Sequence, residues 1–200
     1  MKAKAEIVAL PARSPTPFLS DVTELRRRAR RHIEDGAVTS GYEADKAIVT
    51  KMLNEALATE LVCVLRYRRH YFAATGLPAE AIKKEFLAHA NEEQEHADLI
   101  AGRIVQLGGE PDFDPAGLAS RSHSEYKPGT SLEYMIKEDL VAERVAVESY
   151  TEMVAFLEGK DPTTRRMLES ILAVEEQHAE ELSSMLKNVH GLVAGHFGKS

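Results

Sequence analysis

Apolar residues recur at steps of three and four along four long stretches of the chain, which is the spacing of one face of an α-helix. Each stretch spans close to thirty residues, so each predicted helix would be roughly 40–45 Å long at about 1.5 Å per residue. A fifth, shorter helix is predicted nearer the N-terminus. The five predicted helices cover residues 20–34, 42–75, 79–107, 130–158 and 161 to about 188–191.

The connections predict how these helices pack. Those between the first and second long helices and between the third and fourth span only a few residues, so each pair should form an antiparallel hairpin. The middle connection, residues 108–129, could run the length of a helix at about 3.3 Å per residue. We therefore expect an all-α protein with a four-helix bundle and one long crossover over residues 42–190. An arm and a short helix would precede it in residues 1–41, and a short tail would follow in 191–200.

Capping residues predict where the helices begin. Ser/Thr followed three residues later by Glu forms a capping box, which occurs at residues 40–43 and 130–133. Asp161 followed by Pro162 is typical of an N-cap and the first helical position. Ser20 is the expected N-cap of the short helix.

The middle of every long helix carries polar residues on its apolar seam. They are Glu60, Glu93, His96, Glu143, Glu175 and His178. Burying one unpaired carboxylate costs at least several kcal/mol, and the seams hold no nearby lysine or arginine. Two divalent cations would balance four carboxylates while both imidazoles stay neutral. The sequence therefore predicts a dinuclear metal site in the bundle core.

The spacing of the candidate ligands supports this site. In residues 93–96 and 175–178, Glu and His lie three apart and so share one helix face. One such pair is expected by chance, but two on facing seams, with one further Glu on each remaining helix, are the ligand set of di-iron carboxylate bundles. Oxygen and imidazole ligands without thiolate favour iron or manganese over a structural zinc site. We expect iron, two ions per chain.

Three neighbouring residues have simpler explanations. His89 lies on the same seam, where a hydrogen-bonded core histidine is expected rather than a metal ligand. Tyr67 could orient a ligand, or it could only fill core space. Cys63 is expected to be a small buried side chain, and a single cysteine cannot form an internal disulfide, which agrees with a reducing compartment.

The composition excludes some functions. No apolar run approaches the roughly 20 residues of a membrane span, and the N-terminus makes a poor signal peptide, so we expect a cytoplasmic protein. A net charge of -7 argues against nucleic-acid binding over the whole surface. The exception is a cluster of five arginines in residues 26–31. It could grip DNA phosphates, but the apolar stripe beside it (Val22, Leu25, Ala29 and Ile33) favours packing on a neighbouring subunit.

Four motifs carry a resemblance that spans the long helices. They are residues 60–62 with Tyr67, residues 93–98 followed by 107–111, residues 139–143, and residues 175–178. Together they resemble bacterioferritin and, more loosely, Dps-like proteins that keep a bacterioferritin-type site within one subunit. The resemblance implies a ferritin-like bundle in which the six seam residues are ferroxidase ligands and Tyr67 stands beside them. It also implies oxidation of Fe(II) by O₂ or H₂O₂ and storage of Fe(III) inside a homo-oligomeric shell.

The chain departs from bacterioferritin in ways that limit this comparison. Gln94 stands where bacterioferritin has its haem-ligating methionine, so haem is not expected. The predicted tail is too short for a fifth helix and the N-terminus is longer, so the shell size cannot be carried over. Alternatives are a Dps-type DNA-binding protein that protects against oxidative stress, a manganese catalase or rubrerythrin-like peroxidase, and a purely structural bundle. Rubrerythrin proper is excluded because its cysteine pairs are missing.

Overall fold

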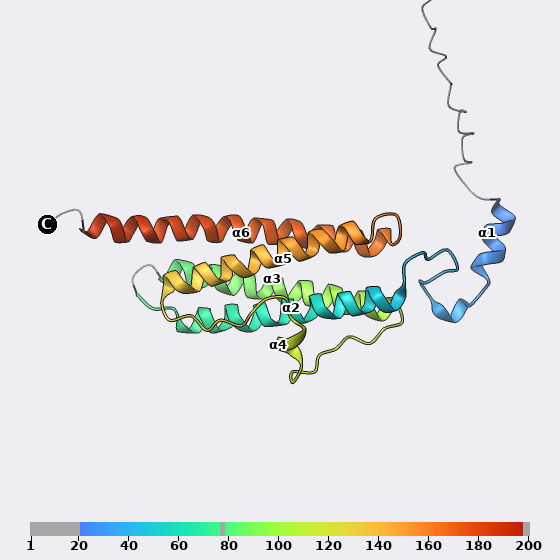
Figure 1. Cartoon of the computed structure of the whole chain (residues 1–200), viewed down its shortest axis with the longest axis horizontal. Helices are drawn as coiled ribbons and strands as arrows, with labels where there is room; N and C mark the ends of the chain where they lie inside the picture. The colour runs from blue at the N-terminus through green and yellow to red at the C-terminus, as the bar shows by residue number, and fades with distance from the viewer. Residues whose placement is uncertain (1–20, 77–78, 198–200) are drawn as a thin grey trace, which may run out of the picture. The chain divides into compact units, whose positions relative to one another are not determined.

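The structure is a computed structural model that describes residues 21–76 and 79–197, with side chains as far as residue 189. The chain divides into two compact units, Met1–Ser40 and Gly41–Ser200, which are described separately. All regular elements in the described residues are helical, which confirms the all-α prediction (Figure 1). None of the described helices combines the length and apolarity that crossing a bilayer would require. The predicted arm, residues 1–19, lies outside the described residues.

The helix of the first unit is shorter than predicted. Helix α1 spans Val22–Ala29, with Asp21 rather than Ser20 as its N-cap, and a 3-10 turn follows at Ile33–Asp35. If the helix continued, Arg26 and Arg30, and likewise Arg27 and Arg31, would lie one turn apart on the same helix face, where their like charges repel. Ile33 therefore does not extend the apolar stripe along the helix.

The second unit is a four-helix bundle of two hairpins, as predicted (Figure 1). Helix α2 packs against α3, and α5 packs against α6. A short helix that the sequence did not predict, α4, lies in the connection between α3 and α5. The bounds are Lys46–Ala73 for α2, Ala79–Gln106 for α3, Leu118–Arg121 for α4, Leu132–Phe156 for α5 and Pro162–Phe197 for α6.

Two of the predicted helix starts were wrong by one to five residues. Helix α2 begins after Asp45, whose carboxylate accepts from the amides of Ala47 and Ile48, and not at the box of residues 40–43. A carboxylate that accepts hydrogen bonds from two otherwise unpaired amides stabilises a helix start well, so the helix begins after Asp45 and not after Ser40. Helix α5 begins after Ser131 rather than Thr130.

The predicted start of α6 is correct. Asp161 accepts from the amide of Thr164 at 2.9 Å, and Pro162 is the first helical residue. Asp161 also binds Arg103 of α3 at 3.1 Å and accepts from the hydroxyl of Tyr42 at 2.9 Å. Burial alone would raise the pKa of Asp161, but the hydrogen bonds from these three residues outweigh it and lower that pKa. The cap therefore also joins the ends of α3 and α6.

The predicted end of α6 was wrong, because the helix continues to Phe197. Gly191 lies at the predicted end, but a glycine within a helix costs only about 1 kcal/mol relative to alanine and need not interrupt it.

The crossover between α3 and α5 follows α2, as the length of the connection predicted (Figure 1). Side chains along α2 bind its backbone in order of their position. The pairs are Asn54 with Asp112 at 2.7 Å, Thr59 with His123 at 2.9 Å, Arg66 with Glu125 at 3.0 Å and His70 with Lys127 at 2.9 Å. The connection is thus fixed in register along the helix, which places α5 beside α2 as its antiparallel neighbour.

The bundle core is apolar at both ends and polar in the middle. Leu53, Leu57, Ile100, Leu168 and Ile171 are buried on one side of the polar layer, and Phe86, Ile136 and Leu182 on the other. Apolar side chains therefore lie on both sides of the polar layer along the bundle axis.

Candidate metal centre

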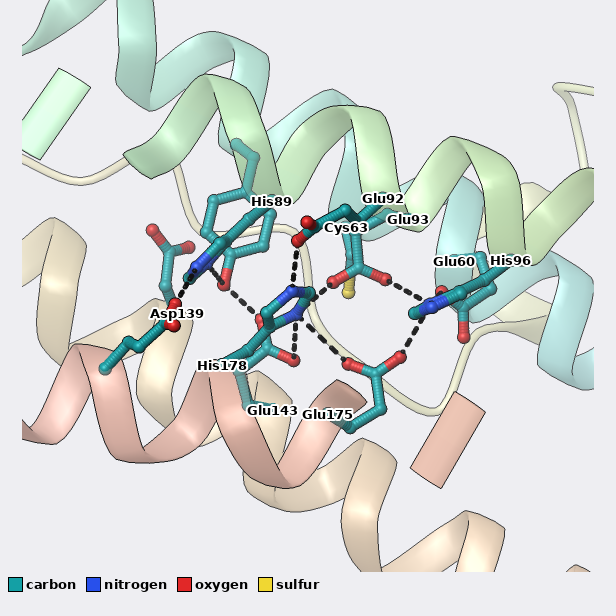
Figure 2. A network of polar contacts seen from close by, with 12 residues as sticks. Glu60, Cys63, His89, Glu92, Glu93, His96, Asp139, Glu143, Glu175 and His178 are labelled. Carbon is teal, nitrogen blue, oxygen red and sulfur yellow. Dashed lines mark hydrogen bonds and ion pairs between the residues drawn. The ribbon is translucent and has the colours of Figure 1, made fainter. Parts of the chain in front are cut away.

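The six side chains predicted as ligands all lie in this polar layer, and all are buried. Glu60 comes from α2, Glu93 and His96 from α3, Glu143 from α5, and Glu175 and His178 from α6 (Figure 2). They meet because each occupies a seam position in the part of its helix that lies within the four-helix bundle.

The six residues form two overlapping groups of candidate ligands. Glu60, Glu93, His96 and Glu175 offer ligand atoms within 4.8 Å of one another, and so do Glu93, Glu143, Glu175 and His178. The two groups share Glu93 and Glu175. Two adjacent positions, each with four protein ligands, therefore lie side by side.

The shared carboxylates each direct one oxygen to each position. Glu93 Oε2 lies 3.8 Å from His96 Nδ1, and Glu93 Oε1 lies 3.6 Å from His178 Nδ1. Glu175 Oε1 lies 3.0 Å from His96 Nδ1, and Glu175 Oε2 lies 3.6 Å from His178 Nδ1. This is the arrangement that a carboxylate bridging two metal ions requires.

The atoms that face the middle of the site have no hydrogen-bond partner among the described residues. They are Glu60 Oε2, Glu93 Oε1, both oxygens of Glu175, and Nδ1 of His96 and of His178. A buried polar atom left unpartnered costs about 1–3 kcal/mol, more when it is charged. All of them are oxygen or imidazole nitrogen atoms, which are ligands that iron and manganese accept. The residues present therefore fit a pair of divalent cations.

Outward-facing atoms of the same residues are held by hydrogen bonds. The hydroxyl of Tyr67 donates to Glu143 Oε1, and the hydroxyl of Tyr150 donates to Glu60 Oε1. His178 Nε2 lies 2.6 Å from Glu92 Oε2. Donation from Nε2–H to that carboxylate leaves the lone pair on Nδ1, the atom that faces the site.

The tyrosines form a reciprocal pattern between α2 and α5. Tyr67 lies seven residues after Glu60 and Tyr150 lies seven residues after Glu143, and each tyrosine binds the glutamate of the other helix. Tyr67 was predicted to lie beside the site, whereas Tyr150 and Glu92 were not predicted to contact it. The repeated Glu-x₆-Tyr spacing on the two helices was the signal that could have identified Tyr150.

Electrostatics oppose four ionised carboxylates in this layer when no metal is bound. Burial, together with the negative charge of Glu93, raises the pKa of Glu60 to about 8. Burial and the charges of Glu93 and Glu175 raise the pKa of Glu143 well above its usual range. Protons therefore take the place of cations on these carboxyl groups.

The imidazoles take up protons for the same reason. Burial alone would lower the pKa of His96, but the carboxylates of Glu175 and Glu60 outweigh it and raise that pKa to about 12. Burial would also lower the pKa of His178, but Glu175 and Glu93 raise it to about 10. Because a metal ion requires the deprotonated ligands, loading the site must expel protons.

A second buried polar cluster lies one helical turn from Glu143. Asp139 of α5 is fully buried and binds Arg66 Nε and His70 Nδ1 of α2, each at 2.8 Å. Arg66 and His70 also bind the crossover backbone, so this cluster joins three segments at one end of the site. Arg66 and His70 were not predicted from the sequence, since their partners depend on the path of the crossover.

His89 is a hydrogen-bonded core histidine, as the sequence predicted. Its Nδ1 lies 3.2 Å from the Tyr67 hydroxyl, and its Nε2 lies 3.0 Å from Glu181 Oε2. Its ring stacks on His178 with the centroids 4.0 Å apart. Cys63 is buried, as expected, and burial raises the pKa of its thiol.

Comparison with known proteins gives consistent relatives. The DNA protection during starvation protein of Pyrococcus furiosus is 33% identical over 161 residues, covering 79% of this chain and 84% of that protein. The bacterioferritin of Desulfovibrio desulfuricans is 27% identical over 151 residues, covering 74% and 80%. Among solved structures, a dodecameric thioferritin of Bacteroides fragilis, described as bacterioferritin-related, matches with a TM-score of 0.74 and 30% identity, covering 76% and 92%.

The family assignment follows from these matches and from the bundle. Residues 50–192 match the family described as ferritin-like domain, which is well over half of the chain. The matched region contains α3 and α5 whole, nearly all of α2 and most of α6, with all six predicted ligands. The resemblance inferred from the motifs is therefore confirmed: the chain belongs to the ferritin-like family.

Proposed function

We propose that this chain is an iron-storage ferroxidase that binds two Fe(II) ions per subunit, oxidises them with O₂ or H₂O₂ and deposits Fe(III) inside a homo-oligomeric shell. The observation that carries the proposal is the pair of four-ligand groups that share Glu93 and Glu175, with the inward atoms lacking hydrogen bonds. Membership of a family that includes bacterioferritins supports iron as the metal.

Each residue has a definite role in this proposal. Glu60 and His96 would hold one ion, Glu143 and His178 would hold the other, and Glu93 and Glu175 would contribute to both positions. Bound iron would supply the one-electron redox chemistry and the attachment point for the oxidant. The protein supplies the charge balance, because four carboxylates offset two divalent cations.

The surrounding residues position the ligands. Tyr67 and Tyr150 each hold the outer oxygen of one terminal glutamate, so the other oxygen is directed inward. Glu92 fixes the His178 tautomer that leaves Nδ1 free. Protons expelled from Glu60, His96 and His178 on loading must leave the buried layer; His178 loses the proton on Nδ1, because Nε2–H stays hydrogen-bonded to Glu92.

Anaerobic titration of the metal-free protein with Fe(II) tests this proposal. Two ions per chain should bind before any mineral forms, and Glu175→Gln should lose that stoichiometry together with rapid oxidation. The matched control is Glu176→Gln, which changes the exposed neighbouring carboxylate. Saturation of the wild-type protein at one ion or none would contradict the dinuclear centre.

A homo-oligomeric shell is part of the proposal because a mineral needs an enclosed space. The B. fragilis relative is dodecameric. Several large apolar side chains stand exposed on the single bundle, as subunit contacts would require: Leu65, Phe72, Leu99, Val105 and Val141. We place the assembly in the cytoplasm, and we propose that haem is not a component, since Gln94 cannot replace a methionine ligand.

A Dps-type DNA-binding protein that protects against oxidative stress is the second candidate. The P. furiosus relative is named for DNA protection, and the arginine cluster of the first unit is mostly exposed. Glu24, however, pairs with Arg27 at 2.6 Å and with Arg28 at 3.8 Å, which neutralises part of the charge. We therefore expect little DNA binding at physiological salt. A salt-sensitive gel shift that is lost when residues 1–35 are deleted would favour this candidate instead.

A further inference from the structure

Helices α2 and α5 are joined by three polar pairs that form a ladder. Two of them are the reciprocal tyrosine–glutamate pairs of the metal centre. The third lies beyond these two, where His70 Nδ1 of α2 is 2.8 Å from Asp139 Oδ2 of α5. From pair to pair, the positions advance by seven and then three residues along α2, and fall back by seven and then four along α5. The steps match because the helices are antiparallel, so all three pairs share one register.

The third pair is reinforced by an ion pair and includes none of the six predicted ligands. Arg66 Nε donates to Asp139 Oδ1 at 2.8 Å, so each oxygen of this carboxylate has its own partner on α2. Arg66, His70 and Asp139 are all at most 1% exposed. Buried ion pairs often add little net stability over apolar side chains of the same volume, because taking both charges out of water is costly. A role in fixing how α2 and α5 meet accounts for this cluster better than a role in stability.

The same side chains attach the crossover to α2. Arg66 Nη1 donates to the carbonyl oxygen of Glu125 at 3.0 Å, and His70 Nε2 lies 2.9 Å from the carbonyl oxygen of Lys127. The backbone comes close to the histidine ring at Gly129, which has a φ of +69° and where a Cβ would lie 3.2 Å from His70 Nε2. The crossover leads directly into α5, so holding it also fixes where α5 begins along α2.

The cluster reaches the metal centre through Tyr67. This residue follows Arg66 directly in α2, and the Arg66 guanidinium lies 5.9 Å from the centre of the Tyr67 ring. Phe86 packs against both Tyr67 and His70, with ring centroids 6.1 and 5.7 Å apart. The Tyr67 hydroxyl donates to Glu143, which lies one helical turn from the carboxylate that the cluster holds. A shift of α5 along α2 would therefore separate Tyr67 from Glu143.

We propose that Arg66, His70 and Asp139 are positioning residues of the metal centre, which set the register of α5 against α2 and so place Glu143 for metal binding. This inference rests on the proposed function, because the placement of Glu143 has this consequence only if it binds metal. The hydrogen bonds of the cluster do not depend on a bound ion. In the metal-free protein, where the carboxyl groups of the centre hold protons, the cluster keeps the two helices in register before the first ion arrives.

Anaerobic competition between the protein and a chelator of known affinity for Co(II) tests the inference by measuring both binding constants. Removing one charge alone would leave the other buried without its partner, which is strongly destabilising, so the test variant Arg66→Gln/Asp139→Asn removes both. The variant should still bind two ions per chain. One position should lose affinity about 10-fold, as is typical when a residue that orients a ligand is lost, and the other should change by less than about twofold.

Two further variants separate positioning from stability. Arg103→Gln/Asp161→Asn is the matched control, because it removes the ion pair that joins the ends of α3 and α6. Both double variants should melt at a lower temperature than wild type, but the control should keep both binding constants. Arg66→Lys keeps the charge but replaces the planar guanidinium with a single amine, which cannot hold Asp139 and the crossover together. It should fold, and it should lose less affinity than Arg66→Gln/Asp139→Asn at the same position.

Combination with the tyrosine variants identifies the affected position. Tyr67→Phe acts on Glu143, as the cluster does, so the combined variant should lose far less affinity than the product of the two separate factors. Tyr150→Phe acts on Glu60, so combining it with the cluster variant should leave two independent losses, one at each position.

The outcomes separate this inference from the proposed function. Wild type that binds two ions, with both binding constants unchanged in Arg66→Gln/Asp139→Asn and in Arg66→Lys, would overturn the inference and leave the proposed function standing. If the double variant does not fold, Arg66→Lys decides in the same way. Wild type that binds fewer than two ions would overturn the proposed function, and the inference with it.

Discussion

Replacing Tyr150 with phenylalanine removes a single oxygen atom beside the proposed metal centre. The hydroxyl is buried and donates to Glu60 Oε1, while the ring packs in the core, so the substitution preserves the shape of the side chain. Glu60 would lose the hydrogen bond that holds its outer oxygen. Its inner oxygen would then no longer be fixed toward the ion that it shares with His96.

The expected effect of Tyr150→Phe is a loss of metal affinity at one of the two positions. Removing a residue that orients a metal ligand typically weakens metal binding about 10- to 100-fold, or about 1.4–2.7 kcal/mol. Only the position of Glu60 and His96 should be affected, because Glu143 keeps its own donor, Tyr67. Tyr67→Phe should weaken the other position by a similar factor, which reflects the reciprocal pairing of α2 and α5.

Competition with a chelator of known affinity, under anaerobic conditions, measures the two binding constants. Tyr134→Phe is the matched control, since Tyr134 is a more exposed tyrosine on the same helix. We expect Tyr150→Phe to bind one ion as wild type does and the second more weakly. Two unchanged constants would mean that Tyr150 only fills core space, and the assignment of positioning roles to the tyrosines would be refuted.

Four further predictions follow from the site and the fold. Glu143→Ala should fold but lose rapid Fe(II) oxidation, as measured by stopped-flow absorbance. Its metal-free form should have a melting temperature no lower than that of the wild type, because one buried acid has been removed. A wild-type oxidation rate would place the chemistry elsewhere. Metal loading near pH 7 should release more than one proton per chain, because Glu60 and His96 hold protons in the metal-free protein, and metal affinity should fall as the pH is lowered. Calorimetry in buffers of different ionisation enthalpy measures the number of protons released. Zero release would contradict the prediction. Asp161→Ala should lower the free energy of unfolding by at least about 1–2 kcal/mol at neutral pH through loss of the cap. Because folding lowers the pKa of Asp161, its contribution to stability is full above the usual pKa of 3.8 and is lost as the pH falls below that value. Denaturation curves of the variant and the wild type should therefore converge in acid. Protein from haem-supplemented cells should show no stoichiometric Soret band, because of Gln94, and a strong band would refute that assignment.

The six candidate ligands could be found from the sequence because they break a pattern. A glutamate such as Glu60 on an apolar seam is an energetic anomaly, and four such anomalies at mid-helix require a common explanation. Helical periodicity fixes which face each residue occupies. The hairpins and the crossover then follow from the lengths of the connections.

The site residues that were not predicted from the sequence do not break any pattern. Tyr150 on a seam looks like an ordinary core residue until the partner helix shows that its hydroxyl meets Glu60. Arg66 and His70 find their partners on the crossover, whose path has no periodicity and is fixed only by tertiary contacts. The starts of α2 and α5 were misplaced because several capping residues lie within a few positions, and the choice among them depends on packing.

The central claim is that two metal ions lie between the four helices, bridged by Glu93 and Glu175. Anomalous diffraction from crystals soaked anaerobically in Fe(II) tests it most directly. We predict two iron peaks within the bundle of each subunit, one beside Glu60 and His96 and the other beside Glu143 and His178. A single peak there, or iron found only at contacts between subunits, would contradict the account.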